Sequence, residues 1–385
     1  MDREIRQEIR QRSKRYNAPI DWLSNMKWSL LRLLVLGSFA AMTCAVILGI
    51  LFYFNHSYGL VDFGSSSVTA DDADINSGYL NITKDMYVWG AYTDSTRLGV
   101  TSRTALVKNY NGIATKLADF SVMHGMDNLL VYVGCCEWDG STFTKGSIPL
   151  HDDFVAFNAP FIENGIGVTA LVYINDDVED ISSPCLDNII TAIKQFNDAN
   201  PSSAFSGVHI DQEPSSIVSM AALITTLKAS HNIAKMNGIQ LSSSSKPRYV
   251  TDSLTINGTR STMLEHLATS VDEVTLLAYY NNAEKVAELV RNAASQDIGP
   301  FKIALETGYV NAESTETFYD QIRSIPSSWF NTFAGVRSSV ESAVGCSVEE
   351  TSCAVDKFVI HDFVQYWEAI YGTEPYTDDA DHGWL

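Results

Sequence analysis

From residue 85 onward, eight short apolar runs alternate with longer segments of helical spacing. The runs are residues 86–89, 128–133, 167–174, 207–211, 239–244, 273–280, 301–307 and 357–363. Runs that are apolar almost throughout are typical of parallel strands, which are buried on both faces. Eight strands, each followed by a helix, over about 300 residues are typical of a closed (β/α)8 barrel. We therefore predict this α/β fold for residues 85–385, with the last strand beside the first; an open, doubly wound sheet is the alternative.

Residues 33–54 form an uncharged apolar stretch that is long enough to cross a bilayer as one helix. Basic side chains precede this stretch, in residues 1–32, and the residues that follow it are acidic. The positive-inside rule then places the basic tail in the cytoplasm. We predict a single-pass type II membrane protein, with a stem rich in Ser, Asp and Gly at residues 55–84. The barrel is then extracellular or in the Golgi or secretory lumen. A buried core helix is the alternative for residues 33–54.

Sequons and cysteines fit that location. Three N-glycosylation sequons follow the apolar stretch, and they begin at Asn55, Asn81 and Asn257. Cys346 and Cys353 bracket a short loop and can form a disulfide in an oxidising compartment. Among Cys135, Cys136 and Cys185, one further pairing is available, and the spacing does not choose it.

The charge of the chain excludes one class of partner. The formal net charge is -20, whereas binding to nucleic acid requires clustered Lys and Arg to neutralise phosphates. The sequence also contains no zinc-type spacing of Cys and His, no Walker loop and no dinucleotide-binding glycine fingerprint. We therefore expect no nucleic-acid partner, no metal ion and no cofactor.

Residues 205–214, FSGVHIDQEP, end a predicted strand with two carboxylates. Successive side chains of a strand point to opposite faces, so His209, Asp211 and Glu213 share one face. Gln212 lies on the other face. Two neighbouring carboxylates suit acid–base chemistry on a glycosidic bond, where one acid stays protonated beside an ionised partner. Solvated acids at an ordinary strand end are the alternative.

The other strand ends bring more candidate side chains to the same rim, because the active sites of such barrels lie at the carboxyl ends of the strands. These side chains are Trp89, Asp176, Asp177, Tyr279, Tyr280, Glu306, His361 and Asp362. Carboxylates can do the chemistry and bind hydroxyl groups, while aromatic faces cover sugar rings. The rim therefore predicts a polysaccharide or other glycan as the partner. Each residue alone also has a structural explanation, such as a core position for His361.

Two segments resemble motifs of family 18 glycoside hydrolases, the chitinase type. Residues 207–214, GVHIDQEP, resemble part of that family's strand 4 motif, DGxDxDxE, whose last Asp and Glu fall on Asp211 and Glu213. Residues 276–280, LLAYY, resemble the strand 6 segment MxYD, with Tyr279 at the tyrosine.

Three positions depart from that family's pattern, where aspartates are replaced by Ser206, His209 and Tyr280. The resemblance implies a substrate-assisted hydrolase without a metal ion. In such an enzyme Glu213 is the acid and Asp211 orients the acetamido group of the substrate. Glu306 is then only a substrate contact.

A second resemblance is to the clan A retaining glycosidases, which include β-glucanases. Their acid/base Glu lies in Asn-Glu-Pro on strand 4 and their nucleophile ends strand 7, and QEP at 212–214 and LETG at 305–308 match these two places. The resemblance implies that Glu213 protonates the leaving oxygen and then activates water. Glu306, ionised, attacks the anomeric carbon, so that the configuration is retained. Gln212 stands where those enzymes have Asn.

These observations together predict a membrane-anchored glycoside hydrolase that acts on extracellular or lumenal glycans. The predicted catalytic residues are Glu213 as acid/base, Glu306 as nucleophile and Asp211 as the group that tunes the charge of Glu213. The candidate substrate-binding residues are Trp89, His209, Tyr279, Tyr280, His361 and Asp362. The chitinase-like hydrolase is one alternative, and a non-catalytic glycan-binding barrel, a lectin or adhesion protein, is another. A glycosyltransferase fits less well, because its Asp-x-Asp motif, Asp72 to Asp74, lies in the predicted stem.

Overall fold

The computed structural model of the protein describes residues 85–89, 113–136, 151–174, 183–296, 298–308, 314–324, 328–348, 352–363 and 366–367. All described residues belong to one compact unit within Val68–Trp384. The predicted tail, transmembrane helix and stem, residues 1–84, lie outside the described residues, as do Asp176 and Asp177. Within the described ranges, no helix combines the length and apolar character needed to span a membrane.

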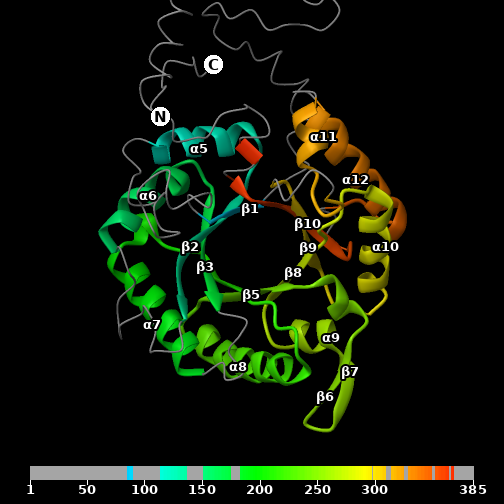
Figure 1. The fold of residues 1–385 in the computed structure, drawn as a ribbon. Coiled ribbons are helices and arrows are strands. Elements are labelled where there is room, and N and C mark those ends of the chain that lie inside the picture. Colours follow the sequence, from blue (N-terminus) through cyan, green and yellow to red (C-terminus); the bar gives the residue numbers. More distant parts are fainter. Residues whose placement is uncertain are drawn as a thin grey trace, which may run out of the picture. The chain divides into compact units, whose positions relative to one another are not determined.

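Eight parallel strands close into a barrel, in the order β1-β10-β9-β8-β5-β4-β3-β2. They surround the centre of Figure 1, and the helices form a ring outside them. Their bounds are β1 (Asp85–Val88), β2 (Asn128–Cys136), β3 (Gly167–Ile174), β4 (Gly207–Asp211), β5 (Gln240–Ser245), β8 (Glu273–Leu277), β9 (Phe301–Glu306) and β10 (Val355–His361). The barrel closes where β1 pairs with β10, with Asp85 opposite Val359. Both the closed barrel and the pairing of the first strand with the last are confirmed.

The helices follow the strands in the expected alternation. They are α5 (Ile113–Met123), α6 (His151–Glu163), α7 (Ser183–Ala199), α8 (Ile217–Met236), α9 (Met263–Ala268), α10 (Ala283–Ala294), α11 (Tyr319–Ser324) and α12 (Ser328–Val344), with the 3-10 turns η1 (Pro201–Ser203) and η2 (Pro247–Val250). Side-chain caps fix several starts. The Ser216 side chain accepts a hydrogen bond from the Ser219 N–H at the start of α8, and Asn282 accepts one from Lys285 at the start of α10.

A two-stranded hairpin, β6 (Ser253–Ile256) and β7 (Thr259–Thr262), interrupts the alternation between β5 and β8. It projects from the ring of helices in Figure 1. Its turn is Asn257-Gly258, and both residues have positive φ, 50° and 82°. An Asn-Gly pair is the favoured sequence for such a two-residue turn, because both central residues must adopt left-handed backbone angles. The strand prediction missed this hairpin.

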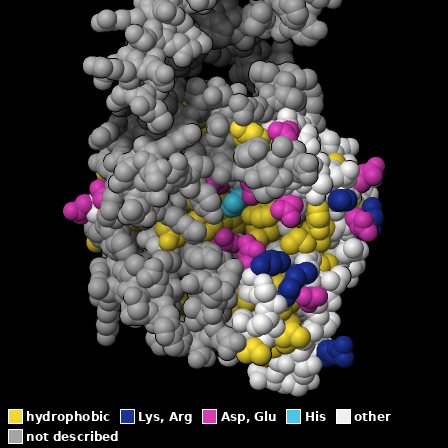
Figure 2. All heavy atoms as spheres, viewed as in Figure 1, with side chains coloured by type: hydrophobic (Ala, Val, Ile, Leu, Met, Phe, Trp, Pro, Cys, Tyr) yellow, Lys and Arg dark blue, Asp and Glu magenta, His cyan; other side chains and the backbone are white. Residues whose placement is uncertain are grey.

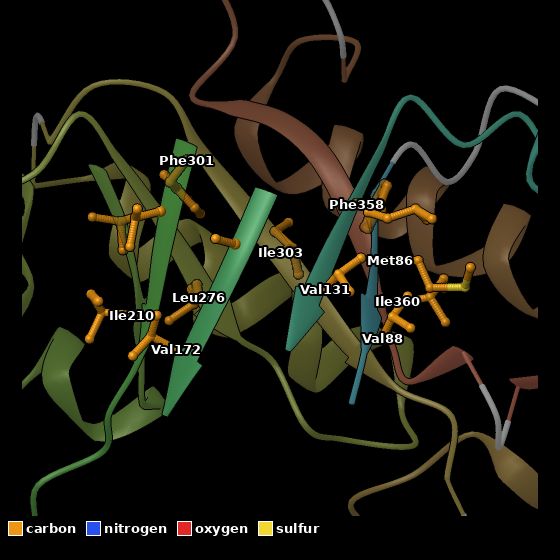
Figure 3. Packing of buried hydrophobic residues seen from close by; sticks show 14 of the residues in the cluster. Met86, Val88, Val131, Val172, Ile210, Leu276, Phe301, Ile303, Phe358 and Ile360 are labelled. Atoms are coloured by element: carbon orange, nitrogen blue, oxygen red, sulfur yellow. The ribbon is translucent and has the colours of Figure 1, made fainter. Parts of the chain in front are cut away.

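Alternation of side chains along the strands produces two buried layers. One face of each strand packs against the helices, as Val131, Val172, Ile210, Leu276 and Ile303 do in Figure 3. The other face fills the barrel interior. The interior hydrophobic cluster consists of Tyr87, Trp89, Leu130, Tyr132, Leu171, Leu277, Ala304 and Val359, with Tyr279 packed against it.

An ion cluster occupies the interior at the amino ends of the strands. The Lys302 Nζ lies 2.5 Å from Asp85 Oδ2 and 2.7 Å from Glu273 Oε1. Burial alone would lower the pKa of Lys302, but the charges of Asp85 and Glu273 outweigh it and raise that pKa above its usual value. The cluster therefore stays charged, and it lies at the end of the barrel opposite the predicted site.

A disulfide joins Cys346 to Cys353, with Cα atoms 5.5 Å apart, and confirms the predicted pairing. It connects the residues after α12 to those before β10. Cys185 is also disulfide-bonded. Such links restrict the unfolded chain and are typical of proteins from oxidising compartments.

Candidate active site

His361, the last residue of β10, is the centre of a hydrogen-bonded group at the carboxyl ends of the strands. Its Nε2 accepts a hydrogen bond from the Trp89 indole N–H at 2.9 Å, and its Nδ1 lies 2.8 Å from Glu306 Oε2. Trp89 directly follows β1 and Glu306 ends β9, the two strands beside β10. The Tyr279 ring lies against His361, with centroids 5.3 Å apart. Figure 2 shows a histidine at the centre of the described face with acidic side chains around it.

The partners of His361 fix where its proton lies. An indole N–H can only donate, so Nε2 must accept and Nδ1 carries the proton that is donated to Glu306. Glu306 Oε1 accepts a second hydrogen bond from the backbone N–H of Gly308 at 2.6 Å. Both oxygens of the Glu306 carboxylate are therefore held in place.

The charge of Glu306 also acts on His361. Burial lowers the pKa of His361, but the Glu306 carboxylate outweighs burial and raises it from 6.5 to about 9. A second proton would sit on Nε2, facing the N–H of Trp89. The cationic form of His361 therefore requires the hydrogen bond from Trp89 to break.

Asp211 ends β4, and Glu213 follows two residues later at the same rim. Burial and then the charge of Glu306 raise the pKa of the Tyr279 phenol well above its ordinary value, and Asp211 and Glu213 act in the same direction. The charges of all three carboxylates thus act on the Tyr279 phenol. Asp211 is 8% exposed, whereas the Glu213 side chain is 30% exposed and closer to solvent.

Gln212 directly follows β4 and is fully buried. If the alternation of β4 continues to this residue, Gln212 lies on the face of Val208 and Ile210, which pack in the outer hydrophobic cluster. Neither its amide nitrogen nor its amide oxygen has a hydrogen-bond partner among the described residues. Within β4 the alternation is observed, because Val208 and Ile210 belong to the outer cluster while His209 bonds to Tyr87 in the barrel interior.

Lys246 was not among the predicted site residues. It directly follows β5, the neighbour of β4, and its Nζ lies 3.3 Å from Glu213 Oε2. The ammonium group stabilises the ionised form of that carboxylate. A sequence signal existed, because Ser242, Ser244 and Lys246 alternate on one face and the last of them reaches the rim.

His209 lies below the rim rather than at it. It is fully buried, with Nδ1 2.8 Å from Ser242 Oγ and Nε2 3.0 Å from both Ser244 Oγ and the Tyr87 hydroxyl. Burial lowers the pKa of His209 to about 3, so the imidazole is neutral. The structure gives His209 a supporting place under the site instead of the substrate contact that the sequence suggested. Tyr87 was also not among the predicted site residues. It points into the barrel interior, as does Trp89 two residues later.

The remaining predicted site residues differ in their exposure and in what they contact. Trp89 is 3% exposed and its ring stacks on Tyr87, with centroids 6.2 Å apart, so it forms a wall rather than an open platform for a sugar. Asp362 is 2% exposed, and its charge contributes to the raised pKa of His361. Tyr280 is half-buried against the outer hydrophobic cluster. In the part of the chain that the structure covers, no group of three His, Cys, Asp or Glu could hold a metal ion.

No family model matches the chain, and no curated protein matches it. Solved structures do. A GH18 chitinase from Pseudoalteromonas aurantia is 10% identical over 73% of this chain and 94% of that one, with a TM-score of 0.45. The spore cortex-lytic enzyme SleL from Bacillus cereus is 10% identical over 75% and 73%, with a TM-score of 0.42. A sugar phosphate isomerase/epimerase from Parabacteroides distasonis is 11% identical over 80% and 94%, with a TM-score of 0.41.

The names of these three proteins describe different activities. At these identities and TM-scores the similarity assigns no activity to this chain.

Proposed function

We propose that the protein is a glycoside hydrolase whose catalytic centre is the carboxylate group around Tyr279. The observation that carries this proposal is that Asp211 at the end of β4, Glu213 two residues beyond it and Glu306 at the end of β9 lie at the carboxyl ends of the strands, and their charges all raise the pKa of the Tyr279 phenol. One carboxyl group can protonate the leaving oxygen while another charge stabilises the positive anomeric carbon. The Tyr279 hydroxyl can donate a hydrogen bond to the sugar.

Two hydrolytic routes are open to these residues, and the direction of Gln212 favours the one that uses Asp211 and Glu213. A counterpart of the clan A asparagine would have to face the mouth to take part in the reaction, whereas alternation continued from β4 turns the buried Gln212 toward the helices. In the favoured route the substrate's own 2-acetamido oxygen forms a bond to the anomeric carbon. The bond to the leaving oxygen breaks, and the carboxyl proton of Glu213 moves to that oxygen. Water, deprotonated by Glu213, then opens the cyclic intermediate with net retention.

The nucleophilic route remains the second candidate, and the Glu306 carboxylate favours it. Its two oxygens are fixed by His361 and by the Gly308 N–H, which is the kind of orientation that a nucleophile needs. In this route Glu306 itself forms the bond to the anomeric carbon, and the 2-acetamido group is not required.

Paired substrates separate the two routes. The full chain is assayed on aryl glycosides that carry either a 2-acetamido or a 2-hydroxy group. The favoured route predicts cleavage of the acetamido substrate alone, with kcat lowered about 10²- to 10⁴-fold in Glu213→Gln and also lowered in Asp211→Asn. The nucleophilic route predicts cleavage of both substrates and complete loss in Glu306→Gln. Glu288→Gln, an exposed change on α10, is the matched control.

A non-catalytic glycan-binding barrel is the candidate from another class. The observation in its favour is that Glu213 is paired with Lys246, and Glu306 with His361. A carboxylate with a cationic partner is a weaker proton donor and a weaker nucleophile. Glycan binding without hydrolysis of any substrate, in the parent chain and in all variants, would establish this class.

We also propose that the barrel is displayed on the outer or lumenal side of a membrane, held by residues 33–54. The charge difference around that stretch supports this orientation. The disulfides at Cys346–Cys353 and at Cys185 fit an oxidising compartment.

A further inference from the structure

Three contacts join the segment after β5 to the loop that carries Glu213. The Tyr249 hydroxyl donates to the Pro214 carbonyl at 2.8 Å, and the Arg248 guanidinium donates to the Ser215 carbonyl at 2.6 Å. Lys246 pairs with Glu213 itself at 3.3 Å. Each of residues 213, 214 and 215 is thus contacted by one side chain from residues 246–249.

The segment is well placed to hold the loop. Pro247 begins η2, and Tyr249 is fully buried with its backbone N–H bonded to the Lys246 carbonyl at 3.0 Å. The Gln296 side chain, just after α10, donates to the Val250 carbonyl at 2.6 Å. Arg248 is more exposed and is shared with Asp252, so Tyr249 is the more rigid contact.

The loop needs such support. β4 ends at Asp211, so Glu213 lies beyond the strand, and the following Pro214 has no backbone N–H to donate. Pro214 is buried, and its carbonyl accepts the Tyr249 hydroxyl. A buried carbonyl that lost this partner would be free to shift toward another donor.

We propose that Tyr249 and Lys246 are positioning residues for Glu213. Tyr249 fixes the loop that carries Glu213, and Lys246 stabilises the negative charge of its carboxylate. This proposal rests on the proposed function for the meaning of Glu213. Tyr249 holds the loop through the Pro214 carbonyl, one residue from the acid. Lys246, 3.3 Å from Glu213 Oε2, stabilises the ionised form of Glu213, which is the form that deprotonates water in the second step.

The kinetic test uses Tyr249→Phe, which keeps the buried ring and removes only the hydroxyl. We expect kcat to fall by about ten- to a hundredfold with KM within about twofold, because small displacements of a reacting group are costly while sugar contacts are unchanged. Ser230→Ala is the matched control, since it removes a buried hydroxyl bonded to Asp187 between α7 and α8. It should lower the melting temperature and leave kcat unchanged. A Tyr249→Phe variant with unchanged kcat would overturn the proposal.

A second readout does not depend on turnover. Carbodiimide labelling of Glu213 in the full chain, followed by peptide mass spectrometry across pH, reports when that carboxyl group is protonated. In Lys246→Met the labelling midpoint should move to higher pH, and Lys246→Arg should restore it toward the parent value. In Tyr249→Phe the labelling rate at a fixed pH should rise severalfold. If Glu213 labelling in the Lys246→Met and Tyr249→Phe variants matches that in Ser230→Ala, the positioning role is wrong. If labelling shifts as expected but no chain hydrolyses any substrate, the proposed hydrolase activity is refuted and the positioning role stands.

Discussion

The Trp89 indole donates to Nε2 of His361, and this single bond decides which nitrogen of the imidazole faces Glu306 with a proton. A tryptophan can only donate, so the bond fits a neutral His361 and opposes its cation. The Glu306 charge has the opposite effect, because it raises the pKa of His361 to about 9. The charge of the site near neutral pH therefore depends on the balance between Trp89 and Glu306.

The first prediction concerns stability against pH. His361 has a folded-state pKa of about 9 against 6.5 in the unfolded chain. Its contribution to the free energy of unfolding is therefore complete below pH 6.5 and is lost as the pH rises through 9. The pKa of His209 is lowered to about 3 and that of His124 to about 4, so their contributions are lost as the pH falls below 6.5. The free energy of unfolding should peak near pH 6.5 and drop by at most about 3 kcal/mol on the alkaline side.

Urea unfolding between pH 5 and 9 measures that curve. Trp89→Phe keeps the aromatic ring and removes the opposing N–H, so its alkaline limb should become steeper. His361→Gln should flatten that limb. A parent chain with no change between pH 6.5 and 9 would show that Trp89 keeps His361 neutral throughout.

The second prediction concerns the ion cluster at the other end of the barrel. Lys302→Met leaves Asp85 and Glu273 buried without their cation, and we expect a loss of about 3–5 kcal/mol in the free energy of unfolding. Lys194→Met is the control, because Lys194 pairs with Asp198 on an exposed helix face and such pairs contribute about 0–1 kcal/mol. Similar losses in the two variants would mean that the buried cluster is not specifically stabilising.

The third prediction concerns the sequon at the hairpin tip. Asn257 is exposed and lies in the turn between β6 and β7, so a glycan there would displace no buried contact. If the barrel is lumenal, the full chain made in eukaryotic cells should carry a glycan at Asn257. Thr259→Ser should keep it and Thr259→Ala should remove it, as read by peptide mass spectrometry after glycosidase release. An unmodified Asn257 in the membrane fraction would argue for the opposite orientation.

The sequence predicted the barrel well, because strands buried on both faces are apolar almost throughout. It also predicted the alternation along β4, where Val208 and Ile210 pack outward and His209 bonds to Tyr87 in the interior. The hairpin was missed although Asn257-Gly258 is a strong turn signal. Its strands are short and half polar, so they lack the apolar runs that marked the other eight.

The contacts within the site were harder to predict, for a physical reason. His361 meets Trp89 across 272 positions of sequence, and Tyr87 meets Ser244 across 157. Such pairs depend on the closure and register of the whole barrel, which no local pattern contains. The same is true of burial, which removed His209 from the surface and left Glu213 partly exposed.

The last prediction uses Gln212 to choose between the two hydrolytic routes. Its amide is fully buried without a hydrogen-bond partner in the described part of the chain, and alternation continued from β4 turns it toward the helices. Gln212→Leu replaces an unsatisfied polar group by an apolar one of similar size, so we expect stabilisation by about 1 kcal/mol and unchanged kcat. Gln296→Leu is the matched control, because that amide bonds to Val250 and Thr262, and its loss should destabilise the fold. If Gln212→Leu instead abolishes hydrolysis while unfolding is unaffected, residue 212 contributes to the reaction as in the clan A enzymes, and the assignment of the chemistry to Asp211 and Glu213 alone is wrong.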